Sequence, residues 1–185
     1  NADFEGLAKL NDGDFFVANR TEADDVWLVG FQSDRAPGRY YRWDRKTRTG
    51  TFLFTTRPKL DGLALAEMKP VVIPARDGLK LHSYLTLPVG VAPKKLPMVL
   101  FPHGGPWARD EWGFNSYAQW FANRGYAVLQ PNFRGSTGYG KKHLNAGNKQ
   151  WGLEMHDDLI DCVNWAVKEG IADPTKVGIM GGSYG

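Results

Sequence analysis

The feature that most constrains the fold of this 185-residue chain is an apolar run at its C-terminal end that stops in a cluster of glycines. The cluster reads Gly181-Gly182-Ser183-Tyr184-Gly185 and matches G-x-S-x-G, a turn in which a strand changes sharply into a helix and holds the serine in a strained conformation with its hydroxyl exposed. Side chains at Gly181 or Gly185 would collide across such a turn. We expect Val177, Ile179 and Met180 to form a short buried strand before it.

Composition restricts the classes of protein to which the chain can belong. Hydrophobic residues make up 42% of it and the net charge is only +3, which is typical of a globular protein and does not indicate a general nucleic-acid surface. No apolar run approaches the roughly 18 residues of a membrane span, and no signal pattern opens the chain. The single Cys162 excludes an internal disulfide framework.

Residues 1–62 are predicted to be rich in β-strands. Short apolar or aromatic runs alternate with turn residues at spacings of about ten to twelve residues, a pattern typical of a sandwich or of propeller blades. The runs are Phe15–Val17, Val26–Val29, Arg39–Trp43 and Thr51–Phe54. Too few strands are present to close either architecture.

The segment from Arg39 to Lys59 is basic and rich in aromatic residues, so it invites comparison with a nucleic-acid surface that uses Tyr40, Tyr41 and Trp43 for stacking. Alternation along a β-hairpin explains the same residues without a ligand, because it places aromatic side chains on the buried face and arginines in water. We therefore expect no nucleic-acid partner.

Residues 63–185 are predicted to form a second region of alternating strands and helices. A hairpin of Val71–Ala75 and Leu79–Leu87, joined at Asp77-Gly78, is followed by the buried strand Pro97–Phe101. The alternating second strand of the hairpin is expected at the sheet margin. This buried strand runs directly into His103-Gly104-Gly105-Pro106, where a glycine pair allows backbone N–H groups to approach a ligand.

Two helices and two further strands complete the predicted pattern. A capping box at Ser116–Gln119 opens a helix that Gly125 ends, and the strand Tyr126–Leu129 follows, parallel to the one before. Apolar residues at helical spacing predict a surface helix over 151–168. Strand, helix, strand, helix and strand form the core of a doubly wound α/β sheet, with Ser183 at the carboxyl end of its strand.

Several residue groups are interpreted as structural. The loop Pro131–Gly140 lacks the spacing of a phosphate-binding loop, and we expect Arg134 to bind loop carbonyls. His82 is expected in solvent and His156 packed at an apolar edge. The acidic side chains of Glu154, Asp157, Asp158 and Asp161 are expected on a helix exterior, so no metal or cofactor is predicted.

Three motifs in this order resemble the prolyl oligopeptidase family of serine peptidases, particularly its acylaminoacyl-peptidase and dipeptidyl-peptidase branches. They are His103–Trp107, Asn132–Gly140 and Gly181–Gly185. The resemblance implies an incomplete α/β-hydrolase domain at 63–185, preceded at 1–62 by the last part of a β-propeller that admits only short peptides.

The resemblance also implies a chemistry and a set of site residues. Ser183 would attack the scissile carbonyl and form an acyl-enzyme, with the backbone N–H groups of Gly105 and Tyr184 as the oxyanion hole. Glycines 104, 181 and 185 and His103 would shape the site, and His103 would not be the general base. No metal, cofactor or membrane partner is implied.

The triad order of this fold is serine, acid, histidine, so the Asp and His partners are expected after Gly185, in the remainder of the same protein. A serine without its base is a weak nucleophile, and we expect the 185-residue chain alone to be inactive. Two other functions stay open at this point: a carboxylesterase or lipase on the same fold, and a non-catalytic interaction module.

Overall fold

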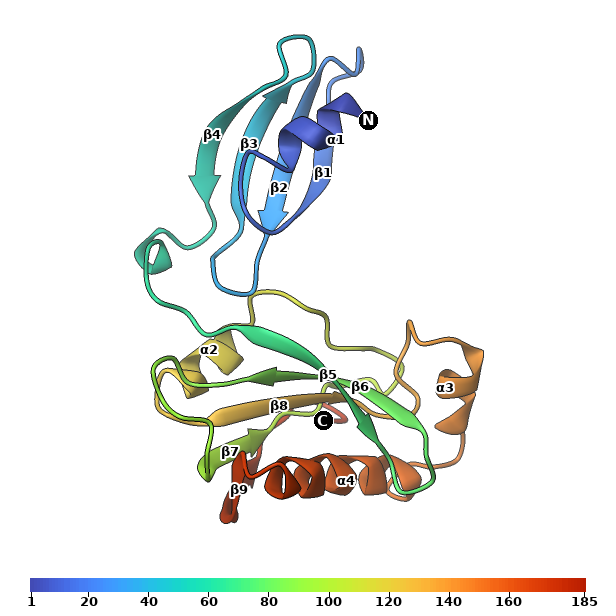
Figure 1. The fold of residues 1–185 in the computed structure, drawn as a ribbon. Helices are drawn as coiled ribbons and strands as arrows, with labels where there is room; N and C mark the ends of the chain where they lie inside the picture. Colours follow the sequence, from blue (N-terminus) through green and yellow to red (C-terminus); the bar gives the residue numbers. More distant parts are fainter. The chain divides into compact units, whose positions relative to one another are not determined.

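The computed structural model describes residues 1–185, which divide into two compact units. The first comprises residues 1–65 together with 113–115, and the second comprises 66–112 together with 116–185. Figure 1 shows the elements of both units along the chain. None of the helices is both long and apolar enough to cross a bilayer.

The first unit is a single antiparallel sheet with one short helix. Its strands pair in sequence order: β1 (Asp14–Arg20), β2 (Val26–Gln32), β3 (Arg39–Asp44) and β4 (Thr49–Thr55). These four strands are the ones expected from the sequence. The helix α1 (Ala2–Leu7) was not expected, and neither was the 3-10 turn η1 (Pro58–Leu60).

The core of the first unit lies on one face of this sheet. Leu7 of α1 is fully buried there, in a cluster with Trp27, Val29, Phe31, Tyr41 and Trp43. The hairpin prediction is correct for Tyr41, Trp43 and the exposed Arg42, but Phe52 and Phe54 of β4 stay half exposed. The expected burial is wrong for Tyr40, which alternates to the face opposite Tyr41 and stacks there on Phe54, whereas Phe52 contacts Tyr41 from the edge strand β4.

The second unit is a mixed five-stranded sheet in the order β5-β6-β8-β7-β9. Its strands are β5 (Met68–Pro74), β6 (Lys80–Thr86), β7 (Leu96–Leu100), β8 (Ala127–Asn132) and β9 (Ala172–Ile179). Strands β5 and β6 form an antiparallel hairpin, and β6 also pairs antiparallel with β8. The pairs β8–β7 and β7–β9 are parallel, as expected. This order, in which strands adjacent in sequence are not all neighbours, belongs to a doubly wound sheet.

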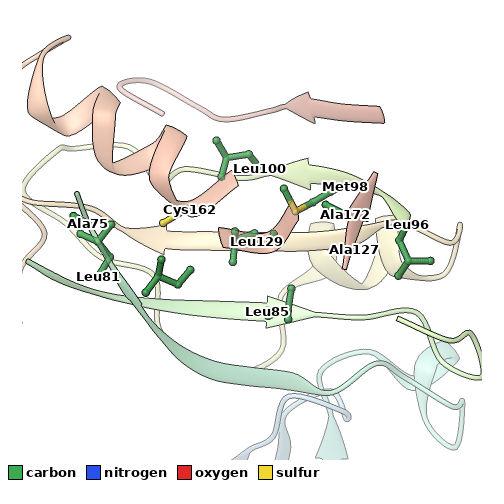
Figure 2. Packing of buried hydrophobic residues seen from close by; sticks show 12 residues of the cluster. Ala75, Leu81, Leu85, Leu96, Met98, Leu100, Ala127, Leu129, Cys162 and Ala172 are labelled. Carbon is green, nitrogen blue, oxygen red and sulfur yellow. The ribbon is translucent and has the colours of Figure 1, made fainter. Parts of the chain in front are cut away.

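Three helices accompany this sheet: α2 (Ser116–Ala122), α3 (Lys141–Ala146) and α4 (Glu154–Lys168). The predicted stripe of α4 faces the sheet, and Cys162 and Ala166 are fully buried in a core with Leu81, Met98 and Leu129. Figure 2 shows Cys162 directed from α4 toward the labelled residues of the sheet. Gln119, assigned to a capping box by the sequence, bonds both backbone groups of Ala66 through its side-chain amide.

Two expectations about burial are wrong at the sheet margins. The edge strand of the hairpin is the apolar β5 rather than the alternating β6, and Val72 is 53% exposed. The strand that leads to Ser183 was expected to be buried, yet Ile179 is 66% exposed. Val72 is exposed because β5 is an edge strand, and within residues 1–185 β9 likewise has a partner strand on one side only.

Candidate active site

The turn at Ser183 has the strained geometry that its sequence predicts. Ser183 lies four residues after the end of β9, is exposed, and has φ of +59°, a left-handed conformation that is uncommon for a residue other than glycine. A Cβ on Gly181 would lie 2.2 Å from the backbone carbon of Gly185. Glycine is therefore required where the chain doubles back, and Ser183 is presented at the carboxyl end of the strand.

The His103–Pro106 turn lies directly against the Ser183 turn. A Cβ on Gly104 would lie 2.9 Å from the carbonyl oxygen of Gly182 and 3.3 Å from the Cβ of Ser183. On the other side, a Cβ on Gly185 would lie 2.2 Å from the carbonyl oxygen of Pro102. The two turns, about 80 positions apart in sequence, therefore touch through backbone at positions that only glycine can occupy.

Strand pairing explains this contact. The parallel strands β7 and β9 are paired with Leu100 opposite Ile179, and the N–H of Met180 continues the ladder by donating to the Leu100 carbonyl at 3.0 Å. Both turns leave the sheet at the same edge because parallel strands end on the same side. The site is thus assembled at the carboxyl ends of neighbouring strands, where doubly wound sheets hold ligands.

Two backbone N–H groups next to the serine have no acceptor. The amides of Gly105 and Tyr184 donate no hydrogen bond within the chain, and Gly105 is exposed with φ of +131°. Donors without partners beside an exposed hydroxyl are the components from which an oxyanion hole is built. Both groups are therefore available to a ligand oxygen.

His103 is held inside the turn and does not contact Ser183. Its Nδ1 lies 2.7 Å from the carbonyl oxygen of Gly104, its Nε2 lies 2.8 Å from the Oγ of Ser136, and its ring stacks on Phe133 with centroids 4.5 Å apart. Burial lowers the pKa of His103, so the ring is neutral at neutral pH. Both ring nitrogens are occupied, which leaves His103 unable to act as a base for Ser183.

The other three histidines do not supply a base either, since the Ser183 hydroxyl bonds to none of them. His143 is buried with its Nε2 3.1 Å from the Phe133 carbonyl oxygen. His82 was expected in solvent but is half-buried and stacked on Tyr139 at 4.6 Å. His156 was expected to be packed but is exposed, and it lies among the residues that line a cavity beside Tyr184.

The loop that follows β8 is fixed by a buried ion pair. Arg134 binds Asp158 of α4 through its Nε at 2.9 Å and its Nη2 at 2.7 Å, and the Arg134 backbone N–H donates to the same carboxylate at 2.8 Å. Arg134 also pairs with Asp77 and Glu154. The expected structural role is correct, but carboxylates replace the expected loop carbonyls.

Arg134 also accounts for an error about α4. Asp158 was expected on the helix exterior and is fully buried against this guanidinium, while Asp161 pairs with Arg76. The acidic cluster is therefore neutralised by arginines, and no group of three or more potential metal ligands gathers anywhere in the chain.

Sequence reasoning missed an aromatic surface beside the serine. Trp107 and Trp151, each more than half exposed, lie 5.6 Å apart by ring centroids, and Trp151 lies 5.3 Å from Tyr184. A cavity of about 240 Å³ adjoins Tyr184. Its lining residues are Pro102, Phe133, Gly152, Met155, His156, Leu159 and Tyr184. Trp107 ends the motif that begins at His103, whereas Trp151 has no motif that links it to the serine.

Comparison with known proteins places these motifs in a peptidase context. Residues 112–185 match the prolyl oligopeptidase family. The whole chain is 53% identical to dipeptidyl aminopeptidase BIII of Pseudoxanthomonas mexicana and covers 28% of that protein. It is 39% identical, over 86% of its length, to dipeptidyl peptidase family member 6 of Caenorhabditis elegans, of which it covers 24%. The chain thus spans about a quarter of the length of these relatives.

Solved structures agree with the fold. A puromycin-hydrolysing peptidase of Mycobacterium tuberculosis superposes with a TM-score of 0.74 at 30% identity, covering 86% of this chain and 25% of that one. The acylaminoacyl peptidase of Pyrococcus horikoshii superposes with a TM-score of 0.71 over 92% of this chain and 28% of that one. Its identity of 24% supports the fold alone.

Proposed function

Because the chain belongs to the prolyl oligopeptidase family, we propose that Ser183 is the nucleophile of a serine peptidase that cleaves short peptides through an acyl-enzyme. The observation that carries the proposal is the contact between the two glycine turns. It brings an exposed, strained Ser183 beside the free N–H groups of Gly105 and Tyr184.

In this mechanism the hydroxyl oxygen of Ser183 attacks the scissile carbonyl carbon, and the carbonyl oxygen becomes an oxyanion between the two N–H groups. The tetrahedral intermediate then expels the amine, and water releases the acyl group from the serine. The donors are backbone groups held by two packed turns, so little reorganisation is needed when the charge develops.

The general base is the component that residues 1–185 do not offer near Ser183. We propose that the Asp and His of the triad come from the remainder of the protein, in the chain order of this fold. The 185-residue chain by itself should then fail to hydrolyse a peptide anilide at enzyme-like rates, and turnover at such rates would contradict this assignment.

The first unit supports a peptidase over an esterase. A four-stranded antiparallel sheet in sequence order has the topology of a propeller blade, and we propose that residues 1–65 contribute such a blade to a propeller that restricts access to short peptides. The name of the relative at 53% identity favours release of dipeptides.

Labelling with a fluorophosphonate tests the nucleophile in the complete protein. We expect the wild type to be labelled and Ser183→Ala to be unlabelled, while the matched control Ser116→Ala, which removes an exposed hydroxyl from the start of α2, keeps wild-type labelling. Labelling that persists in Ser183→Ala would refute the assignment. An intact wild type that resists the probe would favour a non-catalytic interaction module.

Substrate class needs a separate comparison. The complete protein should hydrolyse dipeptidyl anilides, whether or not it also hydrolyses p-nitrophenyl esters of matched acyl length. Cleavage of the esters with no cleavage of any peptide would instead identify a carboxylesterase.

A further inference from the structure

The orientation of one peptide unit decides whether Gly105 can serve as an oxyanion donor. The bond between Gly104 and Gly105 is trans, so the Gly104 carbonyl and the Gly105 N–H point in opposite directions. His103 Nδ1 lies 2.7 Å from that carbonyl oxygen, on the side away from the free N–H. Whatever holds His103 in place therefore also directs the Gly105 N–H.

The hydrogen bond to Gly104 requires a particular tautomer of His103. A carbonyl oxygen can only accept, so Nδ1 must carry the proton, and in a neutral ring Nε2 must then accept. Its one partner is the hydroxyl of Ser136 at 2.8 Å. The Gly104 carbonyl therefore sets the Nδ1–H form, and the Ser136 hydroxyl holds the ring from its other nitrogen.

A second acceptor competes for the hydroxyl hydrogen of Ser136. The carbonyl oxygen of Phe133 lies 2.6 Å from the Ser136 Oγ, but it also lies 3.1 Å from His143 Nε2. When His143 donates to Phe133, the Ser136 hydrogen is free for His103, and every buried group in this chain of bonds is satisfied. Ser136 is itself fully buried, so it cannot touch a substrate.

We propose that Ser136 is a positioning residue that holds the His103 ring through Nε2 and thereby aims the Gly105 N–H at the oxyanion of the reaction. The proposal rests on the function assigned to Ser183 and Gly105. It adds a buried hydroxyl, 47 positions from the nucleophile, to the residues on which the rate depends.

Ser136→Ala in the complete protein tests the proposal. Losing one oxyanion donor typically costs about 10² to 10³ in kcat. Since the variant misdirects Gly105 without removing it, we expect kcat for a dipeptidyl anilide to fall about tenfold or more and KM to change less than about threefold. Ser136→Thr keeps the hydroxyl and should recover most of kcat. Thr137→Ala, which removes the neighbouring half-buried hydroxyl, should behave as the wild type.

Two readouts separate positioning from a merely structural role. In the wild type the nitrogen chemical shifts of His103 should show the proton on Nδ1 and a hydrogen-bonded Nε2, and in Ser136→Ala the Nε2 shift should move to that of a nitrogen without a hydrogen-bond donor. In the double-mutant cycle, His103→Asn removes the ring that Ser136 holds, so adding Ser136→Ala to it should cost little further kcat.

The outcomes are distinct. Wild-type kcat in Ser136→Ala, additive losses in the cycle, or an unchanged Nε2 chemical shift would each overturn the proposal. If Ser136→Thr is folded by circular dichroism and still fails to recover kcat, the proposal is overturned too. A wild type that no fluorophosphonate labels would instead remove the proposed function, while the Nε2 chemical shift would still decide whether Ser136 holds His103.

Discussion

Removing the guanidinium of Arg134 should be among the most destabilising single changes in the second unit. Asp158 has no exposed surface and Arg134 only 4%, and three hydrogen bonds join them. Arg134→Met would leave a buried carboxylate without a cation. Loss of one partner of such a pair costs about 3–5 kcal/mol, whereas the half-exposed partners Asp77 and Glu154 add little.

The dependence on pH has a definite sign. Burial already raises the pKa of Asp158 against the lowering effect of Arg134, and loss of Arg134 should raise it further. A carboxyl whose folded pKa lies above its unfolded value loses stability as the pH rises from the unfolded to the folded pKa, keeps that penalty at higher pH, and regains the stability on acidification. The deficit of Arg134→Met should therefore be larger at pH 8 than at pH 5.

Urea unfolding at the two pH values measures both effects. The double variant Arg134→Met/Asp158→Leu removes both charges and should be more stable than the single variant by about 1 kcal/mol or more, despite the extra change. Arg124→Met, on an exposed arginine just after α2, should stay within about 0.5 kcal/mol of the wild type. A deficit below about 1 kcal/mol for Arg134→Met, or a double variant no better than the single one, would show that the reasoning is wrong.

Three further outcomes are expected in the complete protein. Burial raises the pKa of Asp110 from 3.8 to about 6, a shift worth about 3 kcal/mol. Asp110→Asn should therefore stabilise the fold at pH 8 by up to that amount and lose this advantage as the pH falls from 6 toward 4. A difference in urea midpoints that stays constant with pH would contradict this. Gly104→Ala should lower kcat by about 10² or more, because its Cβ would meet Gly182 and Ser183; near-normal kinetics would mean that the two turns are not in contact. Trp107→Ala should raise KM for dipeptides with apolar side chains more than it lowers kcat, whereas the control Trp120→Ala should leave both unchanged; equal effects of the two variants would exclude a substrate role for the aromatic surface.

The sequence was sufficient wherever local chemistry decides the structure. Alternating runs and turn residues predicted all four strands of the first unit and the parallel strands of the second, and the glycines around Ser183 predicted its strained conformation. These properties follow from steric limits and side-chain periodicity, which are present in any short window of sequence.

The burial and contacts that the sequence could not predict depend on which elements become neighbours in the fold. Ile179 reads as a buried residue but is exposed within residues 1–185, where β9 has a partner strand on one side only, and Asp158 reads as a surface residue and is buried because Arg134 comes from a distant loop. The hydrogen bond from Ser136 to His103 has no sequence signature, since the two residues meet only after β7 and β8 have paired.

The pairing of Leu100 with Ile179 has a consequence for how this region can vary. A slip of two residues between β7 and β9 would keep the side chains on their faces yet separate the two glycine turns by about 6–7 Å, at roughly 3.3 Å per residue. Insertions should therefore be tolerated in the connection 101–171 outside its turns, its helices and β8, but not within β7 or β9. Natural or engineered length changes in this protein are limited by strand register before they are limited by the chemistry of the serine.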